Sequence, residues 1–469
     1  MGSNPNYPLH LRGKLQARAR SPPLRGSAPD FGQRLLRRVL GVHGLTATTD
    51  VYLGPVRAGP LHRWFVIASA AVILAVTLFP IAGAEPQRWI NCLVCGERGI
   101  ADFVDNILLF LPFGAALAAA GFPLPRCVLS AALLSASVEF AQLYIPGRDP
   151  SLGDVVSNTF GSGLGAVLVA TAHYWLLPPR AQAARLSWGA ALAAAAVCYG
   201  TGWLLAPAPP QTRYFALWTP NLAHLAPYQG RVLDAMIGEV RFPGGPIANS
   251  AAARDALRSP EGFSLRVRAV AGPRPAGVAP LFAVYDQHQR EILLLGPDRD
   301  DLVFRFRTRA ATWRLDQPDM RLVGALRAVA PGDSLDVTVH GRRGRYAVTI
   351  NSSATAALGF TLGSGWALLM YPESLPAWLK ALLSVAWVAA LWVPAGFWAR
   401  TRRDGSVIVV TVTIALLGAP VVTSLRATPV LHWAAAVLGA VAAAAYRLVV
   451  ESRERVGAAG EARPQQPAA

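Results

Sequence analysis

Two stretches decide the fold: ADFVDNILLFLPFGAALAAAGF at residues 101–122 and SAALLSASVEFAQLYIPGRDPSLGDVVSNTFGSGLGAVLVA at residues 130–170. Most of their residues are apolar enough to lie in lipid, yet polar side chains recur within them. An ionisable or amide group at membrane depth costs several kcal/mol unless it is paired or hydrated. A set of such groups in one bundle therefore indicates that they have a function.

The whole chain has the composition of an integral membrane protein. Of its 469 residues, 53% are hydrophobic and 15% are charged, whereas soluble proteins carry roughly 25% charged residues. The net charge of +17 comes almost wholly from arginine, but nothing resembles a recognition helix or an aromatic-basic sheet face. We therefore expect the lipid bilayer to be a partner, and we expect no nucleic acid.

Apolar runs long enough to cross a bilayer, about 20 helical residues each, recur along the chain. The eight candidates lie near residues 63–83, 103–121, 126–145, 154–177, 186–206, 377–399, 406–425 and 429–449. Arginine-rich flanks place both termini on the cytoplasmic side of a bacterial inner membrane. The loops 84–102 and 145–153 and the large segment 207–375 then face outward.

Composition and pattern divide the chain into five regions. They are a basic, largely disordered tail at 1–62, a five-span bundle at 63–206, an extracytoplasmic β domain at 207–375, a three-span bundle at 376–450 and a second disordered tail at 451–469. Within the first tail, residues 31–42 (FGQRLLRRVLGV) allow a short amphipathic helix on the inner leaflet. A solvated tail is the alternative for that segment.

Alternating polar and apolar residues separated by turn signals predict strands within 207–375. The predicted strands are 263–270, 280–286, 291–297, 301–308, 334–340 and 345–352. Phe304 and Phe306 alternate with Arg305 and Arg307, which is the period of a half-buried strand. Many short strands joined by turns predict an antiparallel β-sandwich of the jelly-roll type.

The order of these strands resembles concanavalin A-like and laminin-G-like sandwiches over about residues 215–365. The resemblance implies glycan binding at a loop edge, and a cap that packs on the bundle is the alternative. Such domains often hold calcium, and Asp298, Asp300 and Asp301 offer oxygen ligands. Acidic turn residues are usually only solvated, so we expect no cofactor, with calcium as the alternative, and no other metal site.

A constellation of polar residues is expected near the outer leaflet. Glu139 and Gln142 are three residues apart and share a face of the third span. Asp154 and Asn158 are four apart at the start of the fourth span, and a short loop makes the two spans antiparallel neighbours. With a residue from that loop and one from the second span, the predicted site comprises Asn106, Glu139, Gln142, Arg148, Asp154 and Asn158.

Two shorter motifs complete the pattern. Gly161 and Gly165 form a GxxxG, which lets neighbouring membrane helices approach closely. Cys92 and Cys95 lie in the first outward loop, where an oxidising compartment favours a local disulfide. Redox work and metal or partner binding are the alternatives for this pair, although the loop holds no further ligand for zinc.

The strings DNILLFLPFG and EFAQLYIPGRDPSLGDVVSNTFGSGLG resemble the VanZ-like family of bacterial membrane proteins. The resemblance covers roughly residues 65–178. It implies a role in the cell envelope, since a family member is associated with low-level resistance to the glycopeptide teicoplanin. The family's biochemical activity is poorly defined. The matching positions are Asn106, Pro112, Gly114, Glu139, Gln142, Arg148, Asp154, Asn158 and Gly161.

Four functional hypotheses follow for the polar constellation. It binds a polar lipid headgroup, a lipid-linked cell-wall precursor, peptidoglycan or another glycan, with Arg148 on a phosphate or carboxylate and Glu139 or Asp154 on an amine. It is an intramembrane enzyme with Glu139 as general base. It is a hydrogen-bonded structural network without a small-molecule site, or part of a proton-coupled transporter. Binding is favoured over catalysis because no convincing nucleophile lies nearby.

Overall fold

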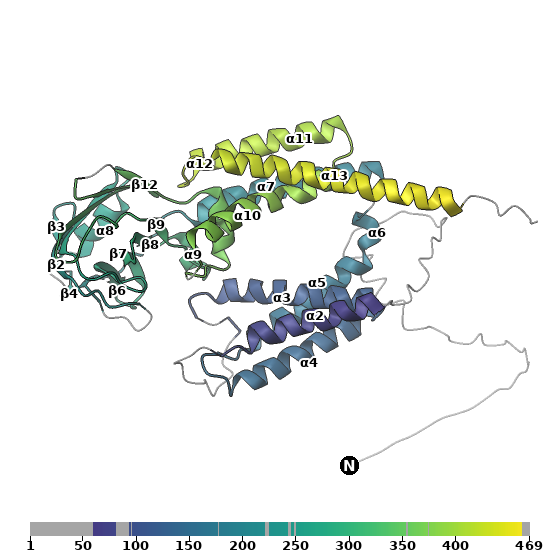
Figure 1. Ribbon diagram of the computed structural model, residues 1–469, viewed down its shortest axis with the longest axis horizontal. Helices are drawn as coiled ribbons and strands as arrows, with labels where there is room; N and C mark the ends of the chain where they lie inside the picture. The colour runs from purple at the N-terminus through teal and green to yellow at the C-terminus, as the bar shows by residue number, and fades with distance from the viewer. Residues whose placement is uncertain are drawn as a thin grey trace, which may run out of the picture. The chain divides into compact units, whose positions relative to one another are not determined.

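The computed structural model describes residues 60–80, 93–94, 96–176, 178–220, 225–242, 245–247, 250–352, 355–373 and 375–461. Helices carry the apolar runs, and strands between residues 214 and 358 form two sheets (Figure 1). The predicted amphipathic helix at 31–42 and the pair Cys92 and Cys95 lie outside the described residues.

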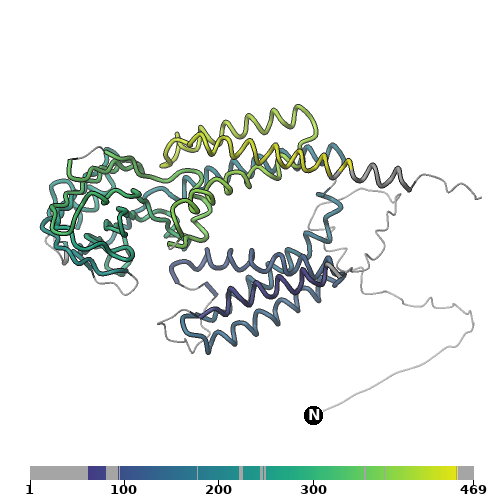
Figure 2. Tube along the Cα trace, in the orientation of Figure 1, coloured from purple at the N-terminus to yellow at the C-terminus, as the bar shows by residue number. Residues whose placement is uncertain are grey.

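The amino-terminal helices form one bundle (Figure 2). Local sequence explains several of its helix ends. The side chain of Ser151 accepts a hydrogen bond from the backbone N–H of Gly153 and caps α5. Pro123 and Pro125 begin α4, where a missing N–H costs nothing. The elements are α2 (Pro60–Thr77), α3 (Gly99–Ala119), α4 (Leu124–Gln142), α5 (Leu152–Ala170) and the short α6 (Ala172–Trp175).

Helices α3 and α5 pack with their backbones in direct contact. A Cβ atom added to Gly161 would lie 2.3 Å from the carbonyl oxygen of Ile107. One added to Gly165 would lie 2.0 Å from the carbonyl oxygen of Leu111. Gly114 makes the reciprocal approach from α3 to Ser162. Small residues therefore permit a helix separation that larger side chains would forbid.

The remaining helices form a second bundle in which α10 and α13 lie side by side (Figure 1). Gly396 and Gly439 face the backbones of Ala440 and Ala389, so this pair also approaches closely. Thr401 and Asp404 form a capping box at the start of α11. The elements are α7 (Arg180–Leu204), α10 (Ala377–Trp398), α11 (Arg402–Thr413), the π-helical η2 (Ile414–Gly418), α12 (Ala419–Val422) and α13 (Val430–Glu461).

Helix α13 continues beyond the point where the sequence predicted a disordered tail. That tail was expected from residue 451, whereas the helix runs to Glu461. Arg447 donates a hydrogen bond of 2.9 Å to Glu451 one turn later. Opposite charges four residues apart stabilise a helix, so this pair supports helical structure across the predicted boundary.

Six helices among the described residues are long and apolar enough to cross a membrane. They are 99–119, 124–142, 152–170, 377–398, 402–422 and 430–449, while His62–Thr77 is a shorter apolar helix. Large apolar side chains on these helices are exposed, such as Val421 at 80% and Leu438 at 65%. The chain is therefore a multi-pass membrane protein, and the count of eight spans and the orientation stay predictions.

The β domain consists of two six-stranded antiparallel sheets. All six strands expected from the sequence are present within a few residues of their predicted bounds. One sheet has the order β4-β1-β6-β7-β8-β9 and the other β12-β11-β10-β5-β2-β3. The strands are β1 (Tyr214–Trp218), β2 (Arg231–Ile237), β3 (Val240–Arg241), β4 (Gly245–Pro246), β5 (Phe263–Val270), β6 (Phe282–Asp286), β7 (Glu291–Asp298), β8 (Asp301–Phe306), β9 (Met320–Leu322), β10 (Ser334–Arg342), β11 (Arg345–Ile350) and β12 (Ala356–Leu358).

Aromatic residues join the two sheets into a sandwich. The ring centroids of Phe263 and Phe306 are 5.6 Å apart, and those of Phe304 and Tyr346 are 4.9 Å apart. The prediction that β8 is half buried is wrong, because Arg305 is only 8% exposed. Carboxylates enclose this arginine on the outer face of the sheet, where Val303 also packs in a small second core. The jelly-roll type stays a prediction.

Hydrogen bonds fasten the sandwich to the ends of α7 and α12. The N–H of Arg309 donates to the carbonyl of Ala206 at 3.0 Å, just beyond the end of α7. Arg345 donates to the carbonyls of Leu425 and Pro420 at 3.0 and 2.6 Å. These bonds hold the base of the sandwich directly against the ends of the two helices.

The contact between α3 and α5 predicts a difference between two neighbouring glycines. Gly161→Ala places a methyl group against a backbone carbonyl, so we expect a loss of about 1–3 kcal/mol in stability. Gly163→Ala is the matched control, because its Cβ would meet only Val128, at 3.5 Å. Thermal unfolding of the purified protein in detergent measures both. Equal unfolding midpoints for the two variants would contradict the close packing.

Candidate functional site

The polar constellation lies where α4 ends and α5 begins. Glu139 and Gln142 are buried in the last turn of α4. Oε2 of Glu139 accepts a hydrogen bond of 2.8 Å from the backbone N–H of Ser151, the residue that caps α5. Asp154 in the first turn of α5 is hydrogen-bonded to the side chain of Asn106 on α3. The fold thus brings three helices together at these side chains.

Gln142 and Arg148 are directed instead to the carboxyl end of α2. Nε2 of Gln142 donates to the carbonyl of Thr77 at 3.0 Å. Nε and Nη2 of Arg148 donate to the carbonyls of Phe79 and Val76 at 2.9 and 2.7 Å. The last carbonyls of a helix lack partners within it, so these two side chains satisfy groups that would otherwise be orphaned. Sequence reasoning missed this role of α2, because a backbone acceptor carries no residue signature.

Asn158 connects the deeper parts of α4 and α5. Its Nδ2 donates to Oγ of Ser135 at 2.9 Å, and both residues are buried. Its Oδ1 is buried and has no hydrogen-bond partner in the described part of the chain. An unsatisfied buried acceptor costs about 1–3 kcal/mol. The position is therefore set by packing between the helices as well as by hydrogen bonding.

Further carboxylates, which the sequence did not single out, lie around the polar constellation. Asp102 and Asp105 precede Asn106 on α3 at a spacing that puts the three on one side of the helix. Asp154 interacts electrostatically with both Asp102 and Glu139. Arg98 is 4.0 Å from Asp102, but neither Glu139 nor Asp154 has a basic partner within ion-pair distance among the described residues. The start of α3, the end of α4 and the start of α5 are thus rich in negative charge.

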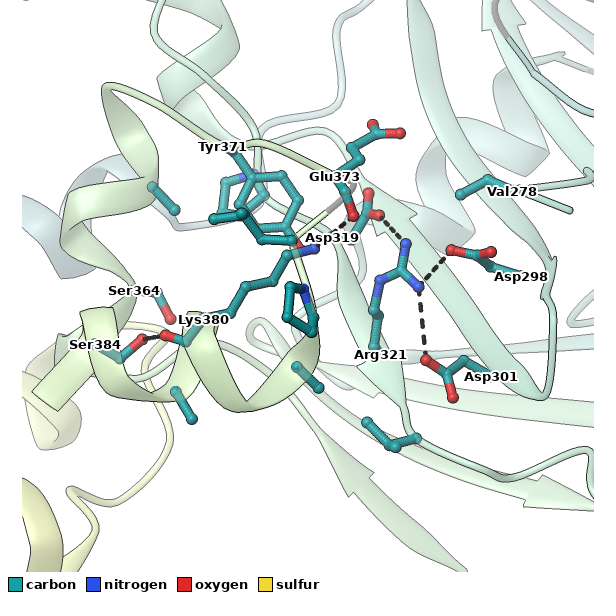
Figure 3. A pocket seen from close by; sticks show the side chains of 18 of the residues that line it. Val278, Asp298, Asp301, Asp319, Arg321, Ser364, Tyr371, Glu373, Lys380 and Ser384 are labelled. Carbon is teal, nitrogen blue, oxygen red and sulfur yellow. Dashed lines mark hydrogen bonds and ion pairs between the residues drawn. The ribbon is translucent and has the colours of Figure 1, made fainter.

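A second polar site lies in the β domain beside the start of α10 (Figure 3). The cavity measures about 540 Å³. Arg321 projects into it and forms ion pairs with Asp298 at 2.5 Å and Asp301 at 3.6 Å. The same guanidinium contacts Asp319 at 3.2 Å. The cavity therefore presents a planar donor among several acceptors.

Lys380 closes the opposite wall of this cavity. Its Nζ donates to the hydroxyl of Tyr371 at 3.3 Å and to the carbonyl of Glu373 at 2.9 Å. The ammonium also lies 4.5 Å from the centre of the Tyr371 ring. Trp366 adds an aromatic surface to the lining. Aromatic faces beside fixed donors and acceptors suit a polyhydroxylated ligand.

The three aspartates considered for calcium are engaged by arginines. Asp298 and Asp301 pair with Arg321, and Asp300 pairs with Arg274 at 2.7 Å. No group of three or more histidine, cysteine, aspartate or glutamate side chains in the described ranges is arranged to hold a metal ion. A calcium ion would have to displace these arginines; that the chain binds no cofactor, with calcium as the alternative, stays a prediction.

A buried ionic network lies behind the cavity, on the outer face of β7 and β8. Arg305 pairs with Asp319, with Glu373 and, at 3.8 Å, with Glu291. Burial raises the pKa of Glu291 to about 7, the charge of Arg305 opposes this, and the neighbouring carboxylates add to it. Glu291 therefore binds its proton more tightly in the folded protein than in the unfolded chain.

This network predicts a pH dependence of stability. The contribution of Glu291 is fully present below its ordinary pKa of 4.5 and is lost as the pH rises through about 7. Replacing it by neutral glutamine, Glu291→Gln, removes this decline, so the variant's melting temperature relative to wild type should rise by a few degrees from acid to neutral pH. Thermal unfolding over that range measures the difference. The exposed Glu239→Gln is the control, and an equal effect there would refute the assignment.

Comparison with known proteins gives a family match for the first bundle. Residues 64–173 match the VanZ/LLP1 family. No curated protein and no solved structure matches the chain. The match includes α3, α4 and α5 and all six residues of the predicted constellation. The likeness of the sandwich to concanavalin A-like domains stays a prediction, whereas the amino-terminal bundle is similar to the VanZ/LLP1 family, as its sequence indicated.

Proposed function

We propose that the protein acts in the bacterial cell envelope by binding the amine of a polar lipid headgroup or lipid-linked cell-wall precursor at the outer leaflet. The observation that carries the proposal is the pair Glu139 and Asp154. These carboxylates lie together at the ends of α4 and α5 without a basic partner in the described part of the chain. A ligand ammonium would supply the missing charge.

The energetics favour such a ligand. Desolvating a carboxylate is costly unless an opposite charge or strong donors compensate. Glu139 receives one backbone N–H, and Asp154 receives the side chains of Asn106 and Ser151. Charge-assisted hydrogen bonds from an ammonium are roughly twice as strong as neutral ones. Binding therefore offsets a penalty that the unliganded bundle carries.

Arg148 would act at the other end of the same ligand. Its Nε and Nη2 are used to bind α2, but Nη1 donates no hydrogen bond to any described residue. This donor would contact the phosphate or carboxylate that accompanies the amine. Likeness to the VanZ/LLP1 family supports a place in the envelope and a link to teicoplanin-type resistance, for which binding of a cell-wall precursor would provide a route.

The alternatives make different demands on the same residues. A structural network is favoured by the bonds of Gln142 and Arg148 to α2, which fasten helices without any ligand. An enzyme would use Glu139 as a general base, and a general base must lie within hydrogen-bond reach of its target proton. The residue's only hydrogen bond given by the structure is to the backbone of Ser151. Ligand binding therefore explains the carboxylate pair by adding one ligand ammonium, without a further catalytic residue.

Lipid retention by purified protein tests the proposal. Wild type in nanodiscs containing phosphatidylethanolamine and phosphatidylglycerol should retain the amine lipid selectively at this site. Asp154→Asn and Glu139→Gln should each lower its retention about tenfold, since a hydrogen bond to a charged group is worth about 1.5–3 kcal/mol. Native mass spectrometry measures the retained lipid.

Asp149→Asn is the matched control, because Asp149 is exposed in the loop between the same two helices. It should retain the amine lipid as wild type does. Unchanged retention in Asp154→Asn with a lowered melting temperature would instead establish the structural network. Conversion of the lipid to a new product that stops in Glu139→Gln would establish the enzyme.

We also propose that the sandwich cavity beside α10 binds a glycan, such as a peptidoglycan fragment. Arg321, Lys380 and the aromatic side chains of Tyr371 and Trp366 support this ligand class. Arg299→Asn removes an exposed cationic side chain from the lining, and asparagine tolerates its left-handed backbone (φ 55°).

Binding of soluble peptidoglycan fragments to the purified full chain tests the glycan proposal by calorimetry. Wild type should bind, and Arg299→Asn should weaken binding several-fold. The exposed Arg231→Asn in the same domain should bind normally. Failure of wild type to bind, or equal weakening in both variants, would refute the glycan site.

A further inference from the structure

A cavity of about 720 Å³ lies where the base of the sandwich meets the ends of α7 and α12. Its lining is unusual in charge, because four arginines contribute to it and no aspartate or glutamate does. The arginines come from three separate parts of the domain. They are Arg258 at the end of α8 (Ser250–Arg258), Arg309 after β8, and Arg342 and Arg343 in the β10–β11 hairpin.

Three of these arginines lack the ionic partners that several other arginines of the sandwich have. Arg258, Arg342 and Arg343 are exposed, and none forms a side-chain ion pair or hydrogen bond with a described residue. By contrast, Arg266 pairs with Asp336 and Arg290 pairs with Asp286. Three unpaired guanidinium groups therefore border a single cavity, where like charges repel one another.

The apolar rim of the cavity fixes its depth relative to a bilayer. Val421 and Val422 at the end of α12 are 80% and 69% exposed, and Trp203 at the end of α7 is 45% exposed. Arg309 lies 5.2 Å from the centre of the Trp203 ring and donates to its carbonyl at 3.2 Å. Tryptophan is enriched at headgroup level. The arginines thus lie just beyond the lipid-facing length of the helices, where phosphates are found.

The cavity is built on a fixed frame. Residues Pro207 and Thr308 form a β-bridge. A Cβ added to Gly344, next to Arg343, would lie 2.6 Å from Cβ of Ser424, so the hairpin touches the chain after α12. The hairpin and loop that carry the arginines therefore need little ordering on binding, which limits the entropic cost to that of the side chains.

We propose that this arginine cavity binds the phosphate of an anionic phospholipid in the adjacent leaflet. Guanidinium groups recognise phosphate oxygens through paired N–H donors. Arginines from several elements converge without a competing carboxylate, and exposed apolar side chains beside them would contact the acyl chains. The inference is independent of the Glu139–Asp154 site, because it concerns a different part of the chain and a ligand without an amine.

The test measures how much phosphatidylglycerol the full-length protein retains from nanodiscs in which the remaining lipid is phosphatidylcholine. Wild type should retain it selectively. The double variant Arg342→Gln/Arg343→Asn keeps side chains suited to the hairpin and should lower retention by roughly five-fold for each arginine removed. Arg258→Gln, on a different element, should give a loss of about five-fold by itself. Native mass spectrometry gives the bound lipid directly.

Arg231→Gln is the matched control, since Arg231 is exposed and pairs in register with Val270, at the far end of β5 from the cavity residue Phe263. Its retention of phosphatidylglycerol should equal that of wild type. Equal losses in Arg231→Gln would show a general effect of charge and overturn the site. Binding of inorganic phosphate with no preference for the anionic lipid would also overturn it, as would full retention in all cavity variants that remain folded.

Discussion

The direct backbone contact between α3 and α5 is the constraint on which the amino-terminal bundle depends. Gly114, Gly161 and Gly165 leave no space for a Cβ, so these helices cannot pack in this way with larger residues. The contact also sets the distance between Asn106 and Asp154, which hydrogen-bond across it. The grouping of the polar side chains therefore depends on the same close packing that the small residues allow. A residue that separated the helices would also pull the carboxylates away from their donors.

Charge is segregated in the folded protein, and the two proposed lipid contacts follow from that segregation. Carboxylates gather at the ends of α3, α4 and α5, whereas uncompensated arginines gather at the base of the sandwich. Between these extremes, the network around Arg305 balances its charges internally. Only the unbalanced groups can gain much from a charged ligand, because a paired group must first lose its partner. We accordingly propose an amine ligand for the carboxylates and an anionic lipid without an amine for the arginine cavity.

The candidate site could be predicted in part from sequence spacing. Glu139 with Gln142 and Asp154 with Asn158 lie on the helices expected for them, because helical periodicity is a local property. The partners of these residues could not be predicted equally well. Arg148 and Gln142 bind backbone carbonyls of α2, and any residue at those positions offers the same acceptor. Asp102 and Asp105 were overlooked because their relevance depends on which face of α3 meets α5.

Sequence by itself determined the apolar helices, the six strands with clear alternation and the likeness of the first bundle to the VanZ/LLP1 family. Each of these rests on residues close together in the chain. Tertiary structure decided the burial of Arg305, which depends on Asp319 and Glu373 from outside its strand. It also decided that arginines from three segments share one cavity without a carboxylate. The charge of each side chain is known from the sequence, but whether an opposite charge compensates it depends on which distant segments the fold brings together.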